Sequence, residues 1–158
     1  MDISIPIGPG RFNFRTGVIV IDQDRVLLHR NEYDEHWALP GGRVEMFEST
    51  EDTAVREMKE ELDVEVVVDR LLWFTENFFQ FEGEAFHEIA AYYHVSLRDS
   101  LYKGNEPFTG KEGDRVLIYQ WFPISRLNEI ELYPEFLRDG LKKLPLHPEF
   151  LTIKDEMG

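Results

Sequence analysis

The segment that most constrains the fold is a predicted helix over Glu51–Leu62, in which carboxylates border an apolar stripe. Ser49 or Thr50 can cap its start, and no glycine or proline interrupts it. At about 100° per residue, one arc of the helix holds the apolar stripe: Ala54, Val55, Met58 and Leu62. The neighbouring arc holds three carboxylates: Glu57, Glu60 and Glu61. We therefore expect the helix to pack on a core and to carry negative charges along the border of that core.

A positive partner would make this cluster of like charges favourable. Like charges three or four positions apart destabilise a helix by about 0.2–0.5 kcal/mol per pair, whereas a hard divalent cation would bind them. Glutamate-rich helix faces are usually only solvated, and it is the preceding loop that favours a metal site. There, Pro40-Gly41-Gly42 can bring a free backbone carbonyl beside the carboxylates. Bound Mg²⁺, with Mn²⁺ as an alternative, would neutralise phosphate oxygens and activate a water, which suits phosphoryl chemistry.

The charge balance narrows the partners of such a site. The chain has 31 acidic and 17 basic side chains and a net charge of −14. Such a surface repels a phosphate backbone at long range, so we expect no nucleic-acid partner. A small phosphorylated ligand stays compatible, because bound cations invert the local field. The same acidic balance also serves solubility.

The remaining composition indicates one globular domain over residues 1–158. We find no internal repeat and no linker-like stretch. No apolar run reaches a membrane-spanning length, and the first residues lack the pattern of a secretory signal. There is no cysteine, which excludes disulfides and thiolate sites and is compatible with the cytoplasmic location that we expect.

The pattern of apolar and turn residues predicts a mixed sheet flanked by helices. The predicted strands are Phe14–Ile21, Arg25–Arg30, Val64–Val68, Leu71–Phe81, Phe86–Leu97 and Arg115–Phe122. The first two form a hairpin across Asp22-Gln23-Asp24. We expect a long loop over Ser100–Asp114 and one or two helices over Pro123–Leu144.

The helix and its flanks resemble a known motif. The matching residues are Gly42-x5-Glu48-x7-Arg56-Glu57-Met58-x-Glu60-Glu61-x-Asp63-Val64. This stretch is similar to the Nudix box of the Nudix (MutT-like) hydrolases, except that the family has glycine at the position of Asp63. That glycine ends the helix, and aspartate is among the few residues that tolerate the same backbone conformation. The resemblance implies an α/β/α sandwich around a mixed sheet. It also implies Mg²⁺-dependent hydrolysis of a pyrophosphate bond in a nucleoside diphosphate linked to another group.

The resemblance also implies a role for each motif residue. Glu57, Glu60, Glu61 and the carbonyl of Gly42 would bind the metal. Arg56 would orient Glu57 by a bidentate contact and share Glu48. The general base would be a glutamate of the box or an acid of a later loop, for which Glu112 and Asp114 are the candidates.

Substrate-binding residues are less constrained by the sequence. Four candidates are Arg15, Phe79, His87 and Glu88. Adjacent strand residues point to opposite faces, so only one of His87 and Glu88 can face a given pocket. By the same resemblance, family members that cleave ADP-ribose typically have a proline shortly downstream of the box. No proline lies between Pro40 and Pro107, so that subclass is disfavoured.

Two alternative functions belong to other classes of protein. An isopentenyl diphosphate isomerase resembles Nudix proteins but relies on a cysteine, which this chain lacks. A catalytically silent Nudix-like nucleotide sensor or protein-interaction module would commonly have lost box glutamates, and all are retained here. A homodimer is expected, since many small domains of this kind pair.

Overall fold

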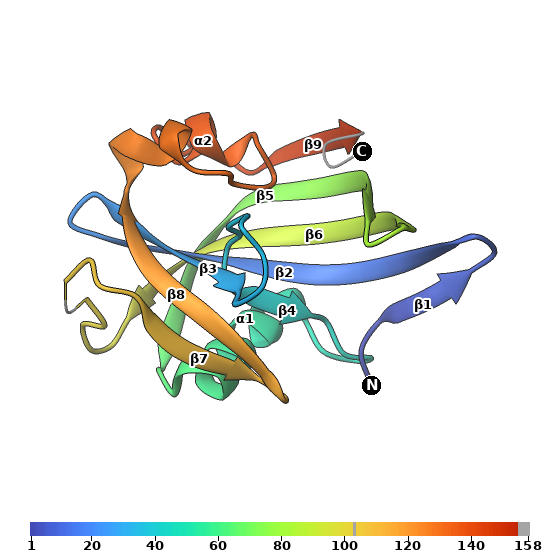
Figure 1. The fold of residues 1–158 in the computed structure, drawn as a ribbon, viewed down its shortest axis with the longest axis horizontal. Coiled ribbons are helices and arrows are strands. Elements are labelled where there is room, and N and C mark those ends of the chain that lie inside the picture. Colours follow the sequence, from blue (N-terminus) through green and yellow to red (C-terminus); the bar gives the residue numbers. More distant parts are fainter. Residues whose placement is uncertain (103, 155–158) are drawn as a thin grey trace.

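A mixed sheet of nine strands forms the centre of the molecule (Figure 1). This computed structural model describes residues 1–102 and 104–154, and of residues 111 and 112 only the backbone. The strands are β1 (Ser4–Ile7), β2 (Gly10–Asp22), β3 (Arg25–Asn31), β4 (Gly41–Arg43), β5 (Val66–Phe81), β6 (Glu84–Leu97), β7 (Phe108–Glu112), β8 (Arg115–Pro123) and β9 (Glu149–Lys154). Their order is β7-β8-β3-β2-β6-β5-β9, and β1 and β4 pair with β2 off this path. The pairs β2–β6 and β5–β9 are parallel and the others antiparallel, so the sheet is mixed as predicted.

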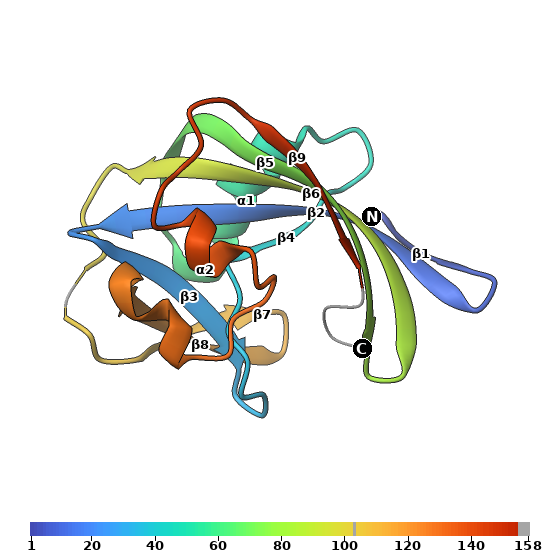
Figure 2. The ribbon, with the colours of Figure 1, turned by 90° about the horizontal axis from the view of Figure 1, so that it is seen from above.

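Helices cover the sheet from two sides, as in the expected α/β/α sandwich (Figures 1 and 2). They are α1 (Thr50–Leu62), the 3₁₀ helix η1 (Ile124–Glu129) and α2 (Leu137–Gly140). One core cluster contains Ala54 and Met58 of α1, and a second contains Leu127 of η1 and Leu137 of α2. Two packed cores thus hold the sheet between the helices. Within the described ranges, no helix is both long and apolar enough to span a membrane.

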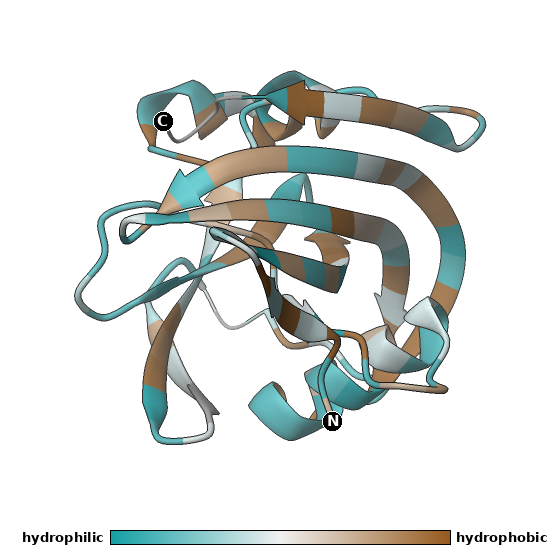
Figure 3. Cartoon of the chain, turned by 90° about the vertical axis from the view of Figure 1, so that its right-hand side faces the viewer, coloured by the Kyte–Doolittle hydropathy of each residue, from teal (hydrophilic) through white to brown (hydrophobic). Residues whose placement is uncertain are grey.

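The hairpin of β2 and β3 is confirmed and is built as a tight turn requires. Its central residues, Gln23 and Asp24, both have positive φ, 51° and 61°. Positive φ at both positions matches the right-handed twist of the flanking strands. β2 is longer than predicted and continues to pair with β6 over Gly10–Val20. In Figure 3, hydrophilic and hydrophobic segments follow one another along the long curved strands, as expected when the two faces differ.

Several boundaries differ from the prediction for identifiable physical reasons. The two strands expected over Val64–Phe81 are one strand, β5, because two register shifts replace the expected break. The predicted long loop contains β7, and the predicted last helices are reduced to the short η1 and α2. β1, β4 and β9 were not predicted. β4 has only three residues, β1 contains a proline, and both lie off the main path of the sheet.

The helix that carries the motif begins and ends as the sequence predicts. Ser49 caps α1, because its hydroxyl oxygen accepts a hydrogen bond from the backbone N–H of Asp52 at 3.1 Å. At the other end, Asp63 has a φ of 54° and its N–H donates to the carbonyl of Lys59. Val55 is the exception to the predicted stripe, since 41% of it is exposed.

Replacing Asp63 by glycine should raise the free energy of unfolding by about 0.5–1 kcal/mol, because glycine adopts positive φ without the cost of a Cβ. The Lys59–Asp63 ion pair that this change removes is exposed and contributes little. Asp63→Asn is the control: it removes the same ion pair but keeps a side chain that tolerates positive φ. Urea unfolding of the three proteins measures the difference. A glycine variant no more stable than the asparagine variant would contradict this account of the helix end.

A second prediction concerns His29 of β3, which is 7% exposed. Burial lowers its pKa from about 6.5 to about 3, and the nearby Arg15 and His36 add to the effect. Between these values the unfolded chain binds a proton that the folded chain does not, so stability falls as the pH falls. The slope contributed by one such group is about 1.4 kcal/mol per pH unit. Replacing His29 by phenylalanine should flatten the loss of stability between pH 6.5 and pH 4, measured by urea unfolding. Equal pH dependence in both proteins would show that His29 is not buried in its neutral form.

Candidate active site

A cavity of about 650 Å³ lies beside α1 and contains most of the predicted site residues. We call it the carboxylate cavity. Its acidic lining residues are Asp2, Glu45, Glu57, Glu60, Glu61 and Glu88, and its basic ones are Arg15, Arg43, Arg56 and Arg115. Gly42 of β4 also lines it. The structure therefore brings all four predicted metal-binding residues to one hollow, which arginines and carboxylates line together.

Arg56 is the centre of the charged network. Its Nε and Nη2 donate to the two oxygens of Glu48 at 2.7 and 2.9 Å, which is a bidentate contact. Its Nη1 donates to Glu57 at 2.9 Å and to Glu60 at 3.2 Å. Nη2 also donates to the backbone carbonyl of Arg43 at 3.1 Å. The expected bidentate contact is thus with Glu48 and not with Glu57, because Glu48 faces the fork of the guanidinium from the loop before α1.

Glu48 fixes this loop to the helix. Besides Arg56 it accepts hydrogen bonds from the hydroxyl of Thr53 at 2.7 Å and from the backbone N–H of Glu45 at 3.1 Å. Hydrogen bonding from Arg56 is the largest of the effects that hold the pKa of Glu48 at about 2. The same network raises the pKa of Arg56. Glu48 is therefore ionised throughout the neutral range and joins the loop to the helix.

The two glycines before α1 permit a close approach that no other residue allows. A Cβ at Gly42 would overlap the carboxyl group of Glu57, and one at Gly41 would overlap the carbonyl of Thr16. Gly41 also has a φ of 146°. Pairing of β4 with β2 holds this backbone in place. The main chain of Gly42 thus lies directly against a metal-binding candidate, as the sequence predicts for Pro40-Gly41-Gly42.

The three box carboxylates differ in exposure. Glu57 and Glu61 are 9% and 6% exposed, whereas 59% of the Glu60 side chain is exposed. Glu61 accepts a hydrogen bond from the hydroxyl of Tyr119 on β8 at 2.7 Å. Among the described side chains, no three acidic or imidazole groups converge into a ready-made metal site. The oxygen donors and the glycine cradle nevertheless fit a hard cation such as Mg²⁺, which would take over part of the contact that Arg56 now makes.

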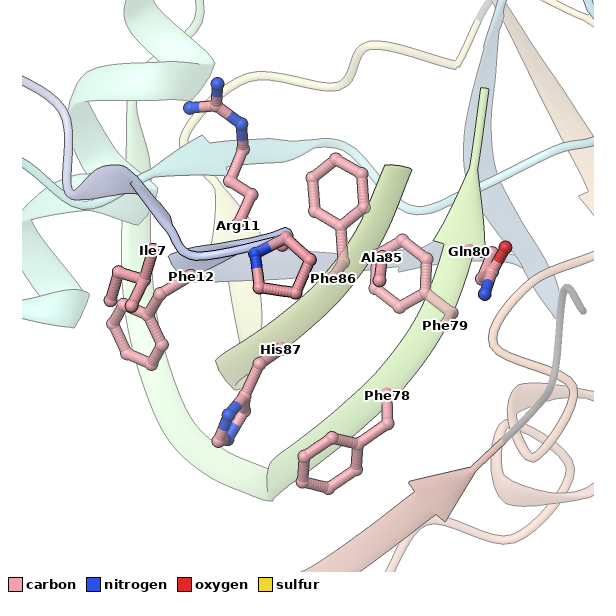
Figure 4. A pocket seen from close by; sticks show the side chains of 11 residues that line it. Ile7, Arg11, Phe12, Phe78, Phe79, Gln80, Ala85, Phe86 and His87 are labelled. Atoms are coloured by element: carbon pink, nitrogen blue, oxygen red, sulfur yellow. The ribbon is translucent and has the colours of Figure 1, made fainter. Parts of the chain in front are cut away.

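The predicted substrate-binding residues fall into two groups. Arg15, Phe79 and Glu88 line the carboxylate cavity. His87 instead lines a second cavity of about 450 Å³ near the β5–β6 turn, where its ring lies 4.5 Å from that of Phe78 (Figure 4). Because neighbouring strand residues point to opposite faces, Glu88 occupies the side of the carboxylate cavity and His87 does not. His87 therefore does not line the carboxylate cavity, and its part in substrate binding stays a prediction.

The candidate loop acids belong to the β7–β8 hairpin. Gly113 and Arg115, in the turn between β7 and β8, line the carboxylate cavity, so this turn borders the site. Asp114 lines a separate hollow. The side chain of Glu112 lies outside the described part of the chain.

Several residues at the cavity were not predicted from the sequence, among them Asn13, Tyr119 and Arg115. Asn13 and Tyr119 read as ordinary members of strands, and only the pairing of those strands brings them to the site. The sequence gives one signal for Asn13: it is a polar residue between two aromatic ones, Phe12 and Phe14.

Comparison with known proteins agrees with this geometry. The family model of the NUDIX domain matches residues 11–144. A solved structure of a UDP-X diphosphatase aligns with a TM-score of 0.60 and 20% identity, over 94% of this chain and 69% of that chain. A MutT NUDIX hydrolase from Burkholderia pseudomallei aligns with a TM-score of 0.54 and 22% identity, over 84% and 97%. An ADP-ribose pyrophosphatase from Streptococcus suis aligns with a TM-score of 0.53 and 19% identity, over 89% and 98%. At these identities the similarity shows a shared fold.

Replacing Arg56 by lysine should lower the free energy of unfolding by about 1–3 kcal/mol, because a single ammonium group cannot replace the fork that binds Glu48. Arg126→Lys is a matched control, since Arg126 makes a bidentate contact with Glu129 at 2.8 and 2.9 Å on the surface. That change should cost less than about 0.5 kcal/mol, because the pair is exposed. Thermal and urea unfolding measure both. Equal losses in the two variants would show that the Arg56 network contributes no more than a surface pair.

Proposed function

The chain belongs to the Nudix hydrolase family, and we propose that it hydrolyses a pyrophosphate bond in a nucleoside diphosphate linked to another group, with Mg²⁺ or Mn²⁺ as cofactor. The observation that carries this proposal is the carboxylate cavity itself. There Glu57, Glu60, Glu61 and Gly42 lie together, with Arg56 bound to two of the carboxylates. Hard oxygen donors beside free volume suit a cation shared with substrate phosphates.

We assign the metal to the three box glutamates and the carbonyl of Gly42. When bound, Mg²⁺ would neutralise the phosphate oxygens and lower the pKa of the attacking water. The burial of Glu57 and Glu61 supports this assignment, because buried carboxylates are as a rule paired or coordinate metals. Gly42 supports it as well, because the missing side chain lets the carboxyl group of Glu57 lie directly against its backbone.

Other residues of the chain position these groups and bind the substrate. Arg56 and Glu48 fix the start of α1 relative to β4, and Tyr119 holds one oxygen of Glu61. Arg15, Arg43 and Arg115 line the same cavity and can contact phosphate oxygens. We keep two candidates for the general base, a box glutamate and Glu112, whose turn borders the cavity.

The expected cytoplasmic location and the homodimer stay predictions. The same holds for the reading of the chain as a silent nucleotide sensor. Retention of every box glutamate, together with the position of Glu57, Glu60 and Glu61 at one cavity, favours the enzyme over the sensor.

The proposal is tested with a panel of nucleoside diphosphate derivatives, assayed for product release with Mg²⁺, with Mn²⁺ and with chelator. We expect metal-dependent cleavage of at least one member, and we expect Glu61→Gln to lower kcat/KM by roughly 10²-fold or more, because it removes a charged metal ligand. Glu51→Gln is the control, since Glu51 is an exposed acid on the same helix but does not line the cavity. Thermal unfolding checks that both variants fold. A fully active Glu61→Gln enzyme would refute the metal assignment, and the absence of any turnover together with nucleotide binding would favour the sensor.

A further inference from the structure

A smaller hollow of about 240 Å³ opens beside the carboxylate cavity. We call it the side pocket. It shares Arg15, Phe79, Phe81 and Glu88 with the carboxylate cavity, so the two hollows adjoin. A ligand with its phosphates at the carboxylate cavity can therefore extend directly into the side pocket.

Aromatic side chains form the walls of the side pocket. The ring of His36 lies 5.9 Å from that of Phe81 and 5.8 Å from that of Tyr133. These rings come from three separate segments of the chain: the β3–β4 connection, the end of β5 and the stretch before α2. All three residues line the pocket. Walls of this kind suit a flat aromatic ligand, which makes large contact area with ring faces.

Beside these walls runs a row of buried polar side chains. Asn13 of β2 pairs with Glu88 of β6, and Glu88 pairs with Asn77 of β5. Directly paired residues point to the same face of a sheet, so the three side chains lie side by side. They are 6%, 8% and 6% exposed. Glu88 and Asn77 both line the side pocket.

The row presents hydrogen-bond acceptors. Asn13 donates to Glu88, and the amide oxygen of Asn77 has no hydrogen-bond partner among the described residues. A buried acceptor without a partner is costly, so a donor from a bound ligand would stabilise the amide of Asn77. Burial raises the pKa of Glu88, while Arg15, Asn13 and Arg43 act in the opposite direction. N–H donors from a ligand would likewise favour the ionised carboxylate.

Building on the proposed hydrolysis, we propose that the side pocket binds the base of the nucleotide and that Glu88 and Asn77 select a base with two adjacent N–H donors, the guanine pattern. The ring N–H and the 2-amino group of guanine lie on one edge, where two acceptors can bind them together. Adenine and cytosine offer an amino group beside a ring acceptor on that edge. Uracil offers one N–H between two carbonyls. Each of these would set an acceptor against Glu88 or Asn77.

The native enzyme tests this directly with the same sugar linked to GDP, IDP, ADP and UDP. Hypoxanthine, the base of IDP, differs from guanine only by the missing 2-amino group. We expect kcat/KM for the GDP derivative to exceed that for the IDP derivative by about tenfold or more, because a buried acceptor loses its donor. The ADP and UDP derivatives should be poorer still.

Two variants assign the preference to the row. Glu88→Gln replaces one acceptor by a donor, and Asn77→Leu removes the amide at similar volume. Each should bring the GDP-to-IDP ratio of kcat/KM close to one. Thr75→Val is the matched control, because the hydroxyl of Thr75 is also buried and without a partner among the described residues on the same strand, but does not line the pocket. Its ratio should equal that of the native enzyme.

The outcomes separate this inference from the proposed function. Turnover without a guanine preference, or a preference that both variants retain, overturns the inference and leaves the hydrolase standing. No turnover of any derivative overturns the proposed function. In that case the Tm shifts produced by GDP and by IDP decide the inference, since equal shifts overturn it and a larger shift with GDP supports it. If Asn77→Leu does not fold, Glu88→Gln and the native ratio still decide.

Discussion

The guanidinium of Arg56 is the contact on which the rest of the site depends. It binds Glu48 through two hydrogen bonds, Glu57 and Glu60 through one each, and the carbonyl of Arg43. Bringing several carboxylates together is unfavourable unless a positive charge with many donors compensates them. Arginine does this because its five N–H groups point in fixed directions. One side chain therefore joins β4, the following loop and α1, and sets where the carboxylates lie.

The hydrogen-bond network of Arg56 also depends on the backbone of Gly41 and Gly42, which lies directly against neighbouring groups. Gly41 and Gly42 lie where any side chain would overlap Thr16 or Glu57. Pairing of β4 with β2 keeps them there, and β2 in turn pairs with β6 over eleven residue pairs. The position of the site is therefore fixed by the sheet, while three of its carboxylates come from the helix. Neither element would form the cavity without the other.

The sequence predicts those parts of the site that depend on local spacing. The cap at Ser49, the left-handed end at Asp63 and the carboxylate face of α1 follow from residues a few positions apart. It does not predict contacts that depend on strand pairing. Tyr119 lies 58 residues from Glu61, and only the position of β8 beside α1 brings the two together. Short elements such as β4 and α2 are not predicted for another reason: they have too few residues to show a periodic pattern.

Strand pairing also decides between His87 and Glu88, which are adjacent in β6. Alternation along a strand shows that His87 and Glu88 face opposite ways, but it does not show which one faces the site. Pairing decides this: Glu88 stands between Asn13 and Asn77, and His87 between Phe12 and Phe78. One row is polar and borders the carboxylate cavity, and the other is aromatic and borders a separate hollow. A buried carboxylate between two amides has little value for packing, whereas it gives the adjoining pocket a means of telling one ligand from another. The polar row is therefore better explained by recognition than by stability.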